Sequence, residues 1–323
     1  IMLQRNYDQS LAAGTICATG TLGQIIPPSI ALVILGDVLS ASYQQSQLSI
    51  GNFSARTVSV GDLFMGAIVP GLMLVFAYAS YVMIRAYTSE GVAPAQEVRQ
   101  IDNKWRIIMS TLLPPFVLIT SVLGSILAGI ATPTEAAGVG ALGGLILAIS
   151  KSSLTKKNLT EAVETTTEIT AMVFMILLGS SIFSLVFRGF GGDDLITSVF
   201  MDLPGGVFTA VLMVMIIIFL LGFILDFVQI TLVVVPMVGP ALLTLGVDPI
   251  WLGIMIAINL QTSFLTPPFG FALFYLRGVA PDSLPTEAIY RGVVPFILIQ
   301  LVVLICLAIF PGLVTTLPNA IYG

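Results

Sequence analysis

The sequence predicts an all-α, polytopic membrane protein, and three observations support this prediction. Hydrophobic residues make up 57% of the chain and charged residues 9%, with a mean hydropathy of +1.04, whereas soluble domains carry about 25% charged residues. Several apolar runs are long enough to cross a ~30 Å hydrocarbon core, which takes about 20 helical residues. One proline-broken, polar pattern occurs twice, at Asp8–Ser29 and at Asp248–Phe269.

Each copy of this pattern predicts a re-entrant helical hairpin. Both copies begin with Asp, run through small and apolar residues, become polar and break at Pro-Pro, and a second apolar arm follows at Ile30–Leu39 or Gly270–Leu276. Arms of this length are too short to span. Non-helical backbone at membrane depth is tolerated only where protein buries it or where it lines a cavity. Duplicated, Pro-interrupted segments are typical of a transporter's midplane binding site.

The other segments are predicted from apolar runs and charge. Seven runs are expected as spans or half-spans: Leu63–Ile84, Ile107–Ile130, Ala136–Ile149, Ala171–Phe187, Val207–Leu225, Val228–Leu245 and Ala288–Phe310. The polar stretch Thr160–Thr170 is expected at the interface. Basic residues predict cytoplasmic linkers at 85–106 and 151–157, with the acidic stretch 188–206 outside. Hairpins of opposite orientation need an odd number of crossings between them, so Val228–Leu245 or Ala171–Phe187 is expected to lie flat as an arm helix.

The predicted organisation is a repeat with opposite orientations. The run Gly61–Gly71 matches Thr286–Phe296, with Pro70 opposite Pro295, which extends the similarity beyond the hairpins. The first copy has few residues ahead of its hairpin, so we expect the chain to be the C-terminal part of a longer protein. The expected segments are a first hairpin (1–39), a polar insertion loop (40–60), a span and linker (61–106), a scaffold with arm helices (107–189), an outer loop with a broken span (190–245), a second hairpin (246–280) and a final span (281–323).

The two polar tips have the chemistry of an ion site. Proline frees carbonyl groups from the helical ladder, and glycine lets the backbone approach a ligand closely. Freed carbonyls with Thr, Ser and Asn oxygens suit Na⁺, and the helix that starts after each break favours an anionic group. The alternative is that these residues only kink packed helices. The candidate Na⁺ ligands are Gly20, Thr21, Gly23, Pro27, Asn259, Thr262, Ser263, Thr266 and Pro267.

A second set of residues has two readings. An intramembrane carboxylate at Asp226 is functional by default, but Asp is also a good helix cap. Glu135 follows Thr132 and Thr134 in a Thr-Pro-Thr-Glu run that predicts a helix start, and an ion-site or interdomain role remains the other reading. Ser29 and Gly270 lie beside the Pro-Pro breaks, where an ion or substrate would bind.

Other classes of function lack the residues they need. The sequence has no His, and its two cysteines, Cys17 and Cys306, lie in apolar runs, which argues against zinc and iron–sulfur sites. No G-x-x-x-x-G-K-[ST], H-E-x-x-H or G-x-S-x-G motif is present, so neither an ATPase nor an intramembrane enzyme is expected. The few basic residues form no stripe that would bind nucleic acid.

Three motifs carry a resemblance to a known family. G-T-L-G-Q-I-I-P-P-S (Gly20–Ser29), G-I-A-T-P-T-E-A-A-G (Gly129–Gly138) and N-L-Q-T-S-F-L-T-P-P-F-G (Asn259–Gly270) together resemble the large membrane subunit of tripartite ATP-independent periplasmic (TRAP) transporters. The resemblance covers the chain from the first hairpin onward. The hydrophilic stretch Ser40–Ser59 looks like an insertion found in part of that family.

This resemblance implies an inverted-repeat, elevator-type secondary transporter in the bacterial inner membrane. Na⁺, at two or more sites, would drive uptake of a small organic acid that a periplasmic substrate-binding protein delivers, with a small membrane subunit bracing the large one. It places Na⁺ ligands among the tip residues named above, including Ser29. A non-transporting membrane scaffold and a channel-like protein remain the alternatives. The substrate is not specified by the sequence.

Overall fold

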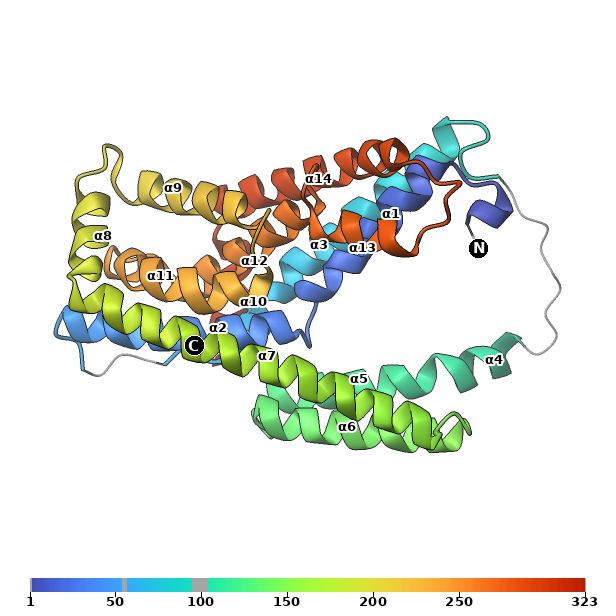
Figure 1. The fold of residues 1–323 in the computed structure, drawn as a ribbon, viewed down its shortest axis with the longest axis horizontal. Helices are drawn as coiled ribbons and strands as arrows, with labels where there is room; N and C mark the ends of the chain where they lie inside the picture. Colours follow the sequence, from blue (N-terminus) through green and yellow to red (C-terminus); the bar gives the residue numbers. More distant parts are fainter. Residues whose placement is uncertain (1, 54–56, 95–103, 323) are drawn as a thin grey trace. The chain divides into compact units, whose positions relative to one another are not determined.

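The computed structural model describes residues 2–53, 57–94 and 104–322. Every regular element in these ranges is a helix (Figure 1). The α-helices are α1 (Gln9–Thr21), α2 (Ile30–Ser49), α3 (Val60–Thr88), α4 (Lys104–Thr111), α5 (Leu113–Leu127), α6 (Pro133–Ser150), α7 (Lys156–Gly189), α8 (Gly192–Met201), α9 (Gly206–Leu221), α10 (Phe227–Gln229), α11 (Val235–Thr244), α12 (Pro249–Leu265), α13 (Phe271–Val279), α14 (Thr286–Ile309) and α15 (Gly312–Tyr322). Short 3₁₀ turns form η1 (Leu3–Arg5) and η2 (Leu22–Gln24), and η3 (Ile230–Val234) is a π-helix.

The chain forms two compact units. The larger one contains Ile1–Gln96 and Phe183–Gly323, the smaller one Glu97–Ile182, and α7 continues from the smaller into the larger. Within the smaller unit α5 and α6 pack closely, with Gly140 and Gly143 of α6 against Val122 and Leu118 of α5. The larger unit contains α1–α2 and α12–α13, the segments predicted as the first and second hairpin, together with the last span α14.

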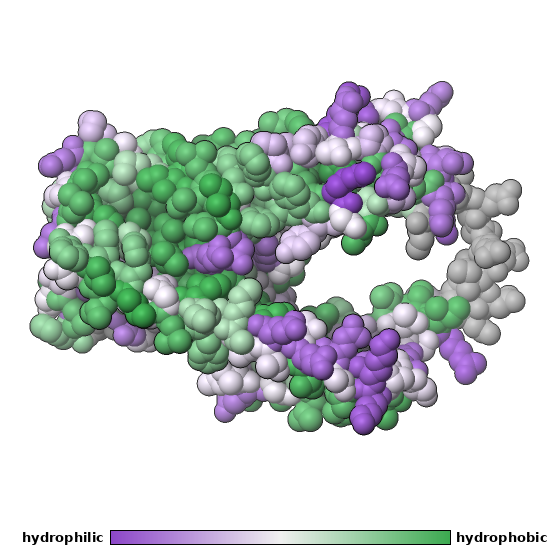
Figure 2. All heavy atoms as spheres, in the orientation of Figure 1, coloured by the Kyte–Doolittle hydropathy of each residue, from purple (hydrophilic) through white to green (hydrophobic). Residues whose placement is uncertain are grey.

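Six helices in the described ranges are long and apolar enough to cross a membrane: Val60–Thr88, Trp105–Leu127, Pro133–Ser150, Lys156–Gly189, Phe227–Thr244 and Thr286–Ile309. Apolar side chains cover most of the face of the larger unit seen in Figure 2, and hydrophilic ones gather at the end where α1 and α14 begin. Exposing so much apolar area to water is unfavourable, and large apolar patches are accordingly rare on soluble proteins. The predicted class, an all-α multi-pass membrane protein, agrees with this arrangement.

The structure differs from the predicted segments in three places. The polar loop expected from Ser40 is helical as far as Ser49, because α2 is 20 residues long, and the arm after the first tip is therefore twice its expected length. The expected interfacial stretch and the apolar run after it form one helix of 34 residues, α7. The outer loop contains α8. Residues 54–56 of the expected loop and 95–103 of the expected linker lie outside the described residues.

The polar part of α2 is helical because its neighbours bury it. Ser42 and Ser46, one turn apart, are buried, and a Cβ added at Gly239 of α11 would lie 3.4 Å from Ser42. Small hydroxyl residues let membrane helices approach one another closely. At the far end of α2, Gln45 accepts a hydrogen bond from Arg188 at 2.7 Å and donates one to Asp193 at 3.2 Å.

Both predicted hairpin segments begin in the same way. Asp8 caps α1 by accepting a hydrogen bond from the Leu11 amide at 2.8 Å, and Asp248 caps α12 by accepting one from the Trp251 amide at 2.8 Å. An Asp in this position satisfies one of the free amides of a first helical turn. Each first arm ends near its Pro-Pro pair, and both Pro-Pro peptide bonds are cis.

The two predicted hairpins do not turn back on themselves, because in each the second arm runs on in the same general direction as the first (Figure 1). Ser283, just after α13, accepts a hydrogen bond from Gln9 at the start of α1 at 3.3 Å, whereas α12 begins at the other end of α14. Each segment is therefore a broken helix, and the prediction of a re-entrant loop is wrong.

The start of α1 contacts the first turns of α14, where Gly14 and Gly292 bring the two backbones together and a Cβ added at Gly292 would collide with the Ser10 carbonyl. The start of α12 contacts the last turns of α14, where the Trp251 indole Nε1 donates to the Leu307 carbonyl at 2.9 Å. The helical tips consequently point toward each other from opposite directions.

Candidate functional site

The two polar tips meet in the interior of the larger unit. Gln261, on α12, donates a hydrogen bond from Nε2 to the Thr21 hydroxyl, at the end of α1, over 3.3 Å. Gln261 is fully buried and Thr21 is 6% exposed. The contact joins the two copies of the sequence pattern at their equivalent polar positions.

A cavity of about 440 Å³ lies beside this contact. Its volume is in the range of sites that hold small molecules, ~300–1,000 Å³. Its wall comes from α1, η2, the end of α12 and the whole length of α13: Ile16, Cys17, Gly20, Thr21, Gln24, Phe264, Phe271, Ala272, Tyr275, Leu276 and Val279. Of the predicted tip residues, the structure places Gly20 and Thr21 in this wall.

Two glutamine oxygens near the tips are buried without a partner among the described residues. They are Oε1 of Gln261 and Oε1 of Gln24. A buried carbonyl oxygen that accepts nothing loses its hydration without replacement, so such an atom is suited to receive a donor or a cation. Neither glutamine was among the predicted ligands. Their position within the polar tips is the signal that points to them, since a side-chain amide oxygen is as good an acceptor as a hydroxyl oxygen.

Tip two is fixed to α9 by two of its predicted ligands. Asn259 donates from Nδ2 to the Met215 carbonyl at 2.8 Å, and Ser263 donates from its hydroxyl to the Phe219 carbonyl at 2.7 Å. The two donors are four residues apart on α12, and the two acceptors are four residues apart on α9. Both hydrogen bonds therefore lie along one helix–helix interface, the α9 seam. At Gly222, just after α9, an added Cβ would lie 2.6 Å from the Ser263 hydroxyl oxygen.

The two threonines of tip two bond to their own helix. Thr262 donates to the Ile258 carbonyl and Thr266 to the Thr262 carbonyl, both at 2.8 Å. Each hydroxyl therefore keeps its oxygen lone pairs available as an acceptor. The backbone turns sharply after Pro267, and a Cβ added at Gly270 would lie 2.5 Å from the Phe264 carbonyl oxygen.

Tip one is held by its own hydrogen bonds. Ser29 donates from its hydroxyl to the Gln24 carbonyl at 2.7 Å and caps α2 by accepting from the Leu32 amide at 3.4 Å. Pro27 is buried, whereas Gly23 is exposed and an added Cβ there would meet no atom within 4 Å. The predicted ligand set is thus divided between the cavity wall, the α9 seam and the local turns. The structure does not gather it into one cage.

The carboxylates Asp226 and Glu135 both belong to capping boxes: Asp226 is the cap residue of α10, and Glu135 lies three residues after Thr132, the cap residue of α6. Asp226 accepts from the Gln229 amide at 2.7 Å, and Gln229 Oε1 accepts from the Asp226 amide at 3.2 Å. Glu135 accepts from the amide and the hydroxyl of Thr132 at 2.8 and 2.9 Å. Thr132, Thr134 and Glu135 are exposed within the smaller unit. Of the two sequence readings, this geometry matches capping.

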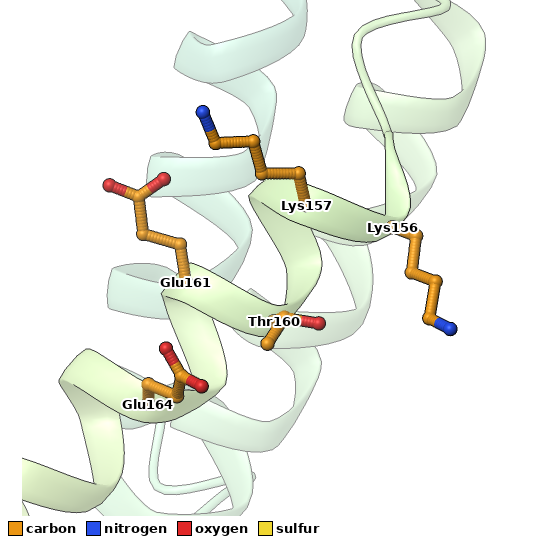
Figure 3. Close-up of a pocket in the computed structure, with 5 residues that line it drawn as sticks. All are labelled: Lys156, Lys157, Thr160, Glu161 and Glu164. Atoms are coloured by element: carbon orange, nitrogen blue, oxygen red, sulfur yellow. The ribbon is translucent and has the colours of Figure 1, made fainter.

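A second pocket, at the start of α7, has a different character. Figure 3 shows its lining side chains, with Lys157 and Glu161 on one side of the helix and Lys156 pointing the other way; the lining is Lys156, Lys157, Thr160, Glu161 and Glu164. All five residues are exposed. This is a solvated, charged helix surface, as expected next to a basic loop. Because all of its side chains are exposed to solvent, none of them needs a ligand as a hydrogen-bond or charge partner.

In the described ranges, no group of three His, Cys, Asp or Glu side chains could hold a metal ion. The polar atoms at the tips are hydroxyl, amide and carbonyl oxygens. Oxygen ligands of this kind suit hard cations such as Na⁺, Mg²⁺ and Ca²⁺ rather than zinc or copper.

Comparisons with known proteins identify the family. The profile described as "Tripartite ATP-independent periplasmic transporter, DctM component" matches residues 1–313. The sialic acid TRAP transporter large permease protein SiaM of Vibrio cholerae is 27% identical over all of this chain and 70% of its own length. The C4-dicarboxylate large permease protein DctM of the same species is 28% identical over all of this chain and 71% of its own. The 2,3-diketo-L-gulonate large permease protein YiaN of Escherichia coli is 26% identical over 97% of this chain and 69% of its own.

The match extends through both broken helices and the spans between them, so the motifs that suggested the family occur within one continuous region of similarity. The chain belongs to the DctM family, the large permease subunits of tripartite ATP-independent periplasmic transporters.

Proposed function

We propose that this chain is the large subunit of a Na⁺-coupled secondary transporter that takes up a small organic acid. The observation that carries the proposal is the meeting of the two polar tips at Gln261 and Thr21 beside a cavity of small-molecule size. The helices before the two breaks approach each other from opposite directions, which supports an inverted repeat of broken helices. In such repeats, substrate and coupling-ion sites lie where the broken helices meet.

Na⁺ fits the donors that the tips offer. Gln261 Oε1 is buried and unpartnered among the described residues, and Thr262 and Thr266 have hydroxyl oxygens that can still accept. Carbonyls freed around Pro27 and Pro267 would complete the coordination. These groups are neutral, so a bound Na⁺ would leave a net positive charge near the cavity. That charge favours the binding of a carboxylate and couples the two ligands.

Hydrogen bonds near the cavity indicate which helices would move together in an elevator-type transport cycle. Asn259 and Ser263 fasten tip two to α9 through main-chain carbonyls, so α9 would move with the second broken helix. Ordered helix packing of this kind supports rigid-body motion of a transport domain against a scaffold. A small membrane subunit and a periplasmic binding protein complete the proposed assembly, which lies in the bacterial inner membrane.

Uptake into proteoliposomes tests the proposal. The vesicles hold the complete large subunit with its small subunit and receive the binding protein and labelled organic acids outside. An inward Na⁺ gradient is compared with a K⁺ gradient and with ATP alone. We expect saturable uptake that requires both Na⁺ and the binding protein.

The double substitution Thr262→Ala with Ser263→Ala should lower this uptake at least tenfold, about 1.4 kcal/mol of lost interaction. The same two changes at Thr197 and Ser198, an adjacent Thr-Ser pair on α8, serve as the matched control. Uptake at the same rate with and without the Na⁺ gradient would show that transport is not coupled to Na⁺. Non-saturating flux with the gradient in both directions would favour a channel, and no flux would favour a scaffold.

A further inference from the structure

The cavity between the polar tips has a wall without formal charge. Among the described residues that line it there is no Lys, Arg, Asp or Glu. Its polar side chains are Thr21, Gln24 and Tyr275 (with the thiol of Cys17), and most of the remaining wall is apolar. The thiol of Cys17 is occupied, since it lies 3.7 Å from the Ala272 carbonyl as a weak donor.

Such a wall disfavours two kinds of organic acid. A dicarboxylate has two charges, and the wall has no charged side chain that could pair with the carboxylate lying farther from the polar tips, which would be desolvated without a counter-charge. A polyhydroxylated sugar acid would bury several hydroxyl groups, each of which needs a hydrogen-bond partner. Thr21, Gln24 and Tyr275 offer too few such partners for a molecule with many hydroxyl groups.

The same wall favours an apolar substrate body. Phe264 and Phe271 have ring centroids 5.5 Å apart in an edge-to-face arrangement, and both contribute to the cavity wall together with Ile16 and Leu276. Apolar surface that moves from water to such a wall contributes favourably in proportion to its area. Aromatic rings add preferred contacts with another ring.

We propose that the substrate is a monocarboxylic acid whose remainder is an apolar ring or a branched hydrocarbon. The inference rests on the proposed function, because it assigns the tip cavity to the transported acid. It differs from the substrates named for the sialic acid and C4-dicarboxylate relatives. One carboxylate would face the bound Na⁺ and the polar tips, and the apolar body would contact the aromatic wall.

Direct binding tests this inference without the selectivity of the binding protein. The purified complex of the complete large and small subunits is titrated calorimetrically in Na⁺ buffer with benzoate, cyclohexanecarboxylate, succinate and N-acetylneuraminate. We expect the two apolar monoacids to bind about tenfold or more tightly than the other two, a difference of ~1.4 kcal/mol or more. Equal or tighter binding of succinate or N-acetylneuraminate would overturn the proposal.

Charge placed in the wall provides a second readout. Ile16, 49% exposed and part of the wall, is replaced by Lys, and Ile50, 56% exposed and outside the wall, receives the same change as control. Ile16→Lys should shift the monoacid-to-succinate affinity ratio toward succinate by about fivefold or more, because it supplies the missing counter-charge, and Ile50→Lys should leave the ratio unchanged. Equal shifts in both variants would contradict the assignment of this cavity.

The substrate class and the transporter function can fail separately. Na⁺-driven uptake of succinate or a sugar acid, with no preference for the apolar acids, would refute the substrate class and leave the transporter function intact. No Na⁺-driven uptake of any acid in the panel, with binding of the apolar acids still measurable, would refute the coupling and retain the cavity assignment.

Discussion

Gln261 donates a hydrogen bond to Thr21 over 3.3 Å, and the other amide atom of Gln261, Oε1, is buried with no partner among the described residues. One side chain therefore both joins the two polar tips and retains an unpaired oxygen. Thr21 in turn donates to the Ala18 carbonyl at 2.9 Å, so it keeps a hydrogen bond when Gln261 is removed. A buried, unpaired acceptor lowers stability and is retained where a function needs it.

Replacing Gln261 with Leu should separate stability from transport. The unpaired oxygen costs about 1–3 kcal/mol while the hydrogen bond to Thr21 contributes about 0.5–1.5 kcal/mol, so we expect Gln261→Leu to be neutral or stabilising. Na⁺-dependent uptake should fall at least tenfold, about 1.4 kcal/mol. The measurements are the thermal midpoint of the solubilised complex and uptake into proteoliposomes.

Added Na⁺ provides the control for this variant. A ligand that binds only the folded state stabilises it by RT ln(1 + [L]/Kd), so at the same Na⁺ concentration the tighter-binding wild type should gain more than Gln261→Leu. A destabilised variant that still responds fully to Na⁺ would indicate that Gln261 has a purely structural role.

The close approach at Gly222 predicts a second effect. A Cβ there would lie 2.6 Å from the Ser263 hydroxyl and 3.3 Å from a Leu260 methyl. Gly222→Ala should push tip two away from α9, lengthen the bond from Ser263 to Phe219, and destabilise the protein by about 1–3 kcal/mol through overpacking. Uptake should fall more than the loss of folded protein explains.

Gly189→Ala is the matched control for this change, because an added Cβ at that exposed helical glycine would meet no atom within 4 Å. It should leave the thermal midpoint and uptake unchanged. If both variants behave alike, the α9 seam has no special importance for the tip.

Asp226 distinguishes a cap from an ion ligand. Asn caps a helix about as well as Asp does, whereas Ala costs ~1 kcal/mol at this position. As a cap, Asp226→Asn should keep both stability and uptake, and Asp226→Ala should lose stability by about that amount. Loss of Na⁺-dependent uptake in Asp226→Asn, with an unchanged thermal midpoint, would restore the ion-site reading.

The sequence predicted the helix starts and the breaks because their signals are local, but it did not predict the direction of the arm after each break, which depends on tertiary packing. Asp8 and Asp248 mark helix starts, and each Pro-Pro pair marks a break, so the positions of α1, α12 and the tips needed no tertiary information. The length of α2 was missed for a physical reason. Ser42 and Ser46 are polar in composition, yet they are buried against a neighbouring helix, where a small side chain matters more than its polarity.

The site was predicted less completely than the fold. The tips were identified as polar and paired, but which oxygens remain free depends on partners that lie far away in the sequence. Asn259 and Ser263 bond to carbonyls of α9, and no local pattern specifies that seam. The sequence does not single out Gln261, because a side-chain amide can form hydrogen bonds with many different partners. Only the packed structure shows that its Oε1 has no partner among the described residues.

The contact between Gly14 and Gly292 predicts how firmly the first broken helix is fixed to the last span. The two backbones touch at this pair, and a Cβ added at either position would collide with main-chain atoms of the opposite helix. Gly292→Ala should therefore separate α1 from α14 and destabilise the protein by about 1–3 kcal/mol, which lowers the thermal midpoint of the solubilised complex. Gly278→Ala, with no atom within 4 Å of the added Cβ, should leave it unchanged. Because tip one reaches Gln261 only while α1 keeps its place on α14, the substitution should also weaken Na⁺ stabilisation. An unchanged midpoint in Gly292→Ala would mean that the two helices separate without penalty, and that the first broken helix is held by α3 and tip two instead.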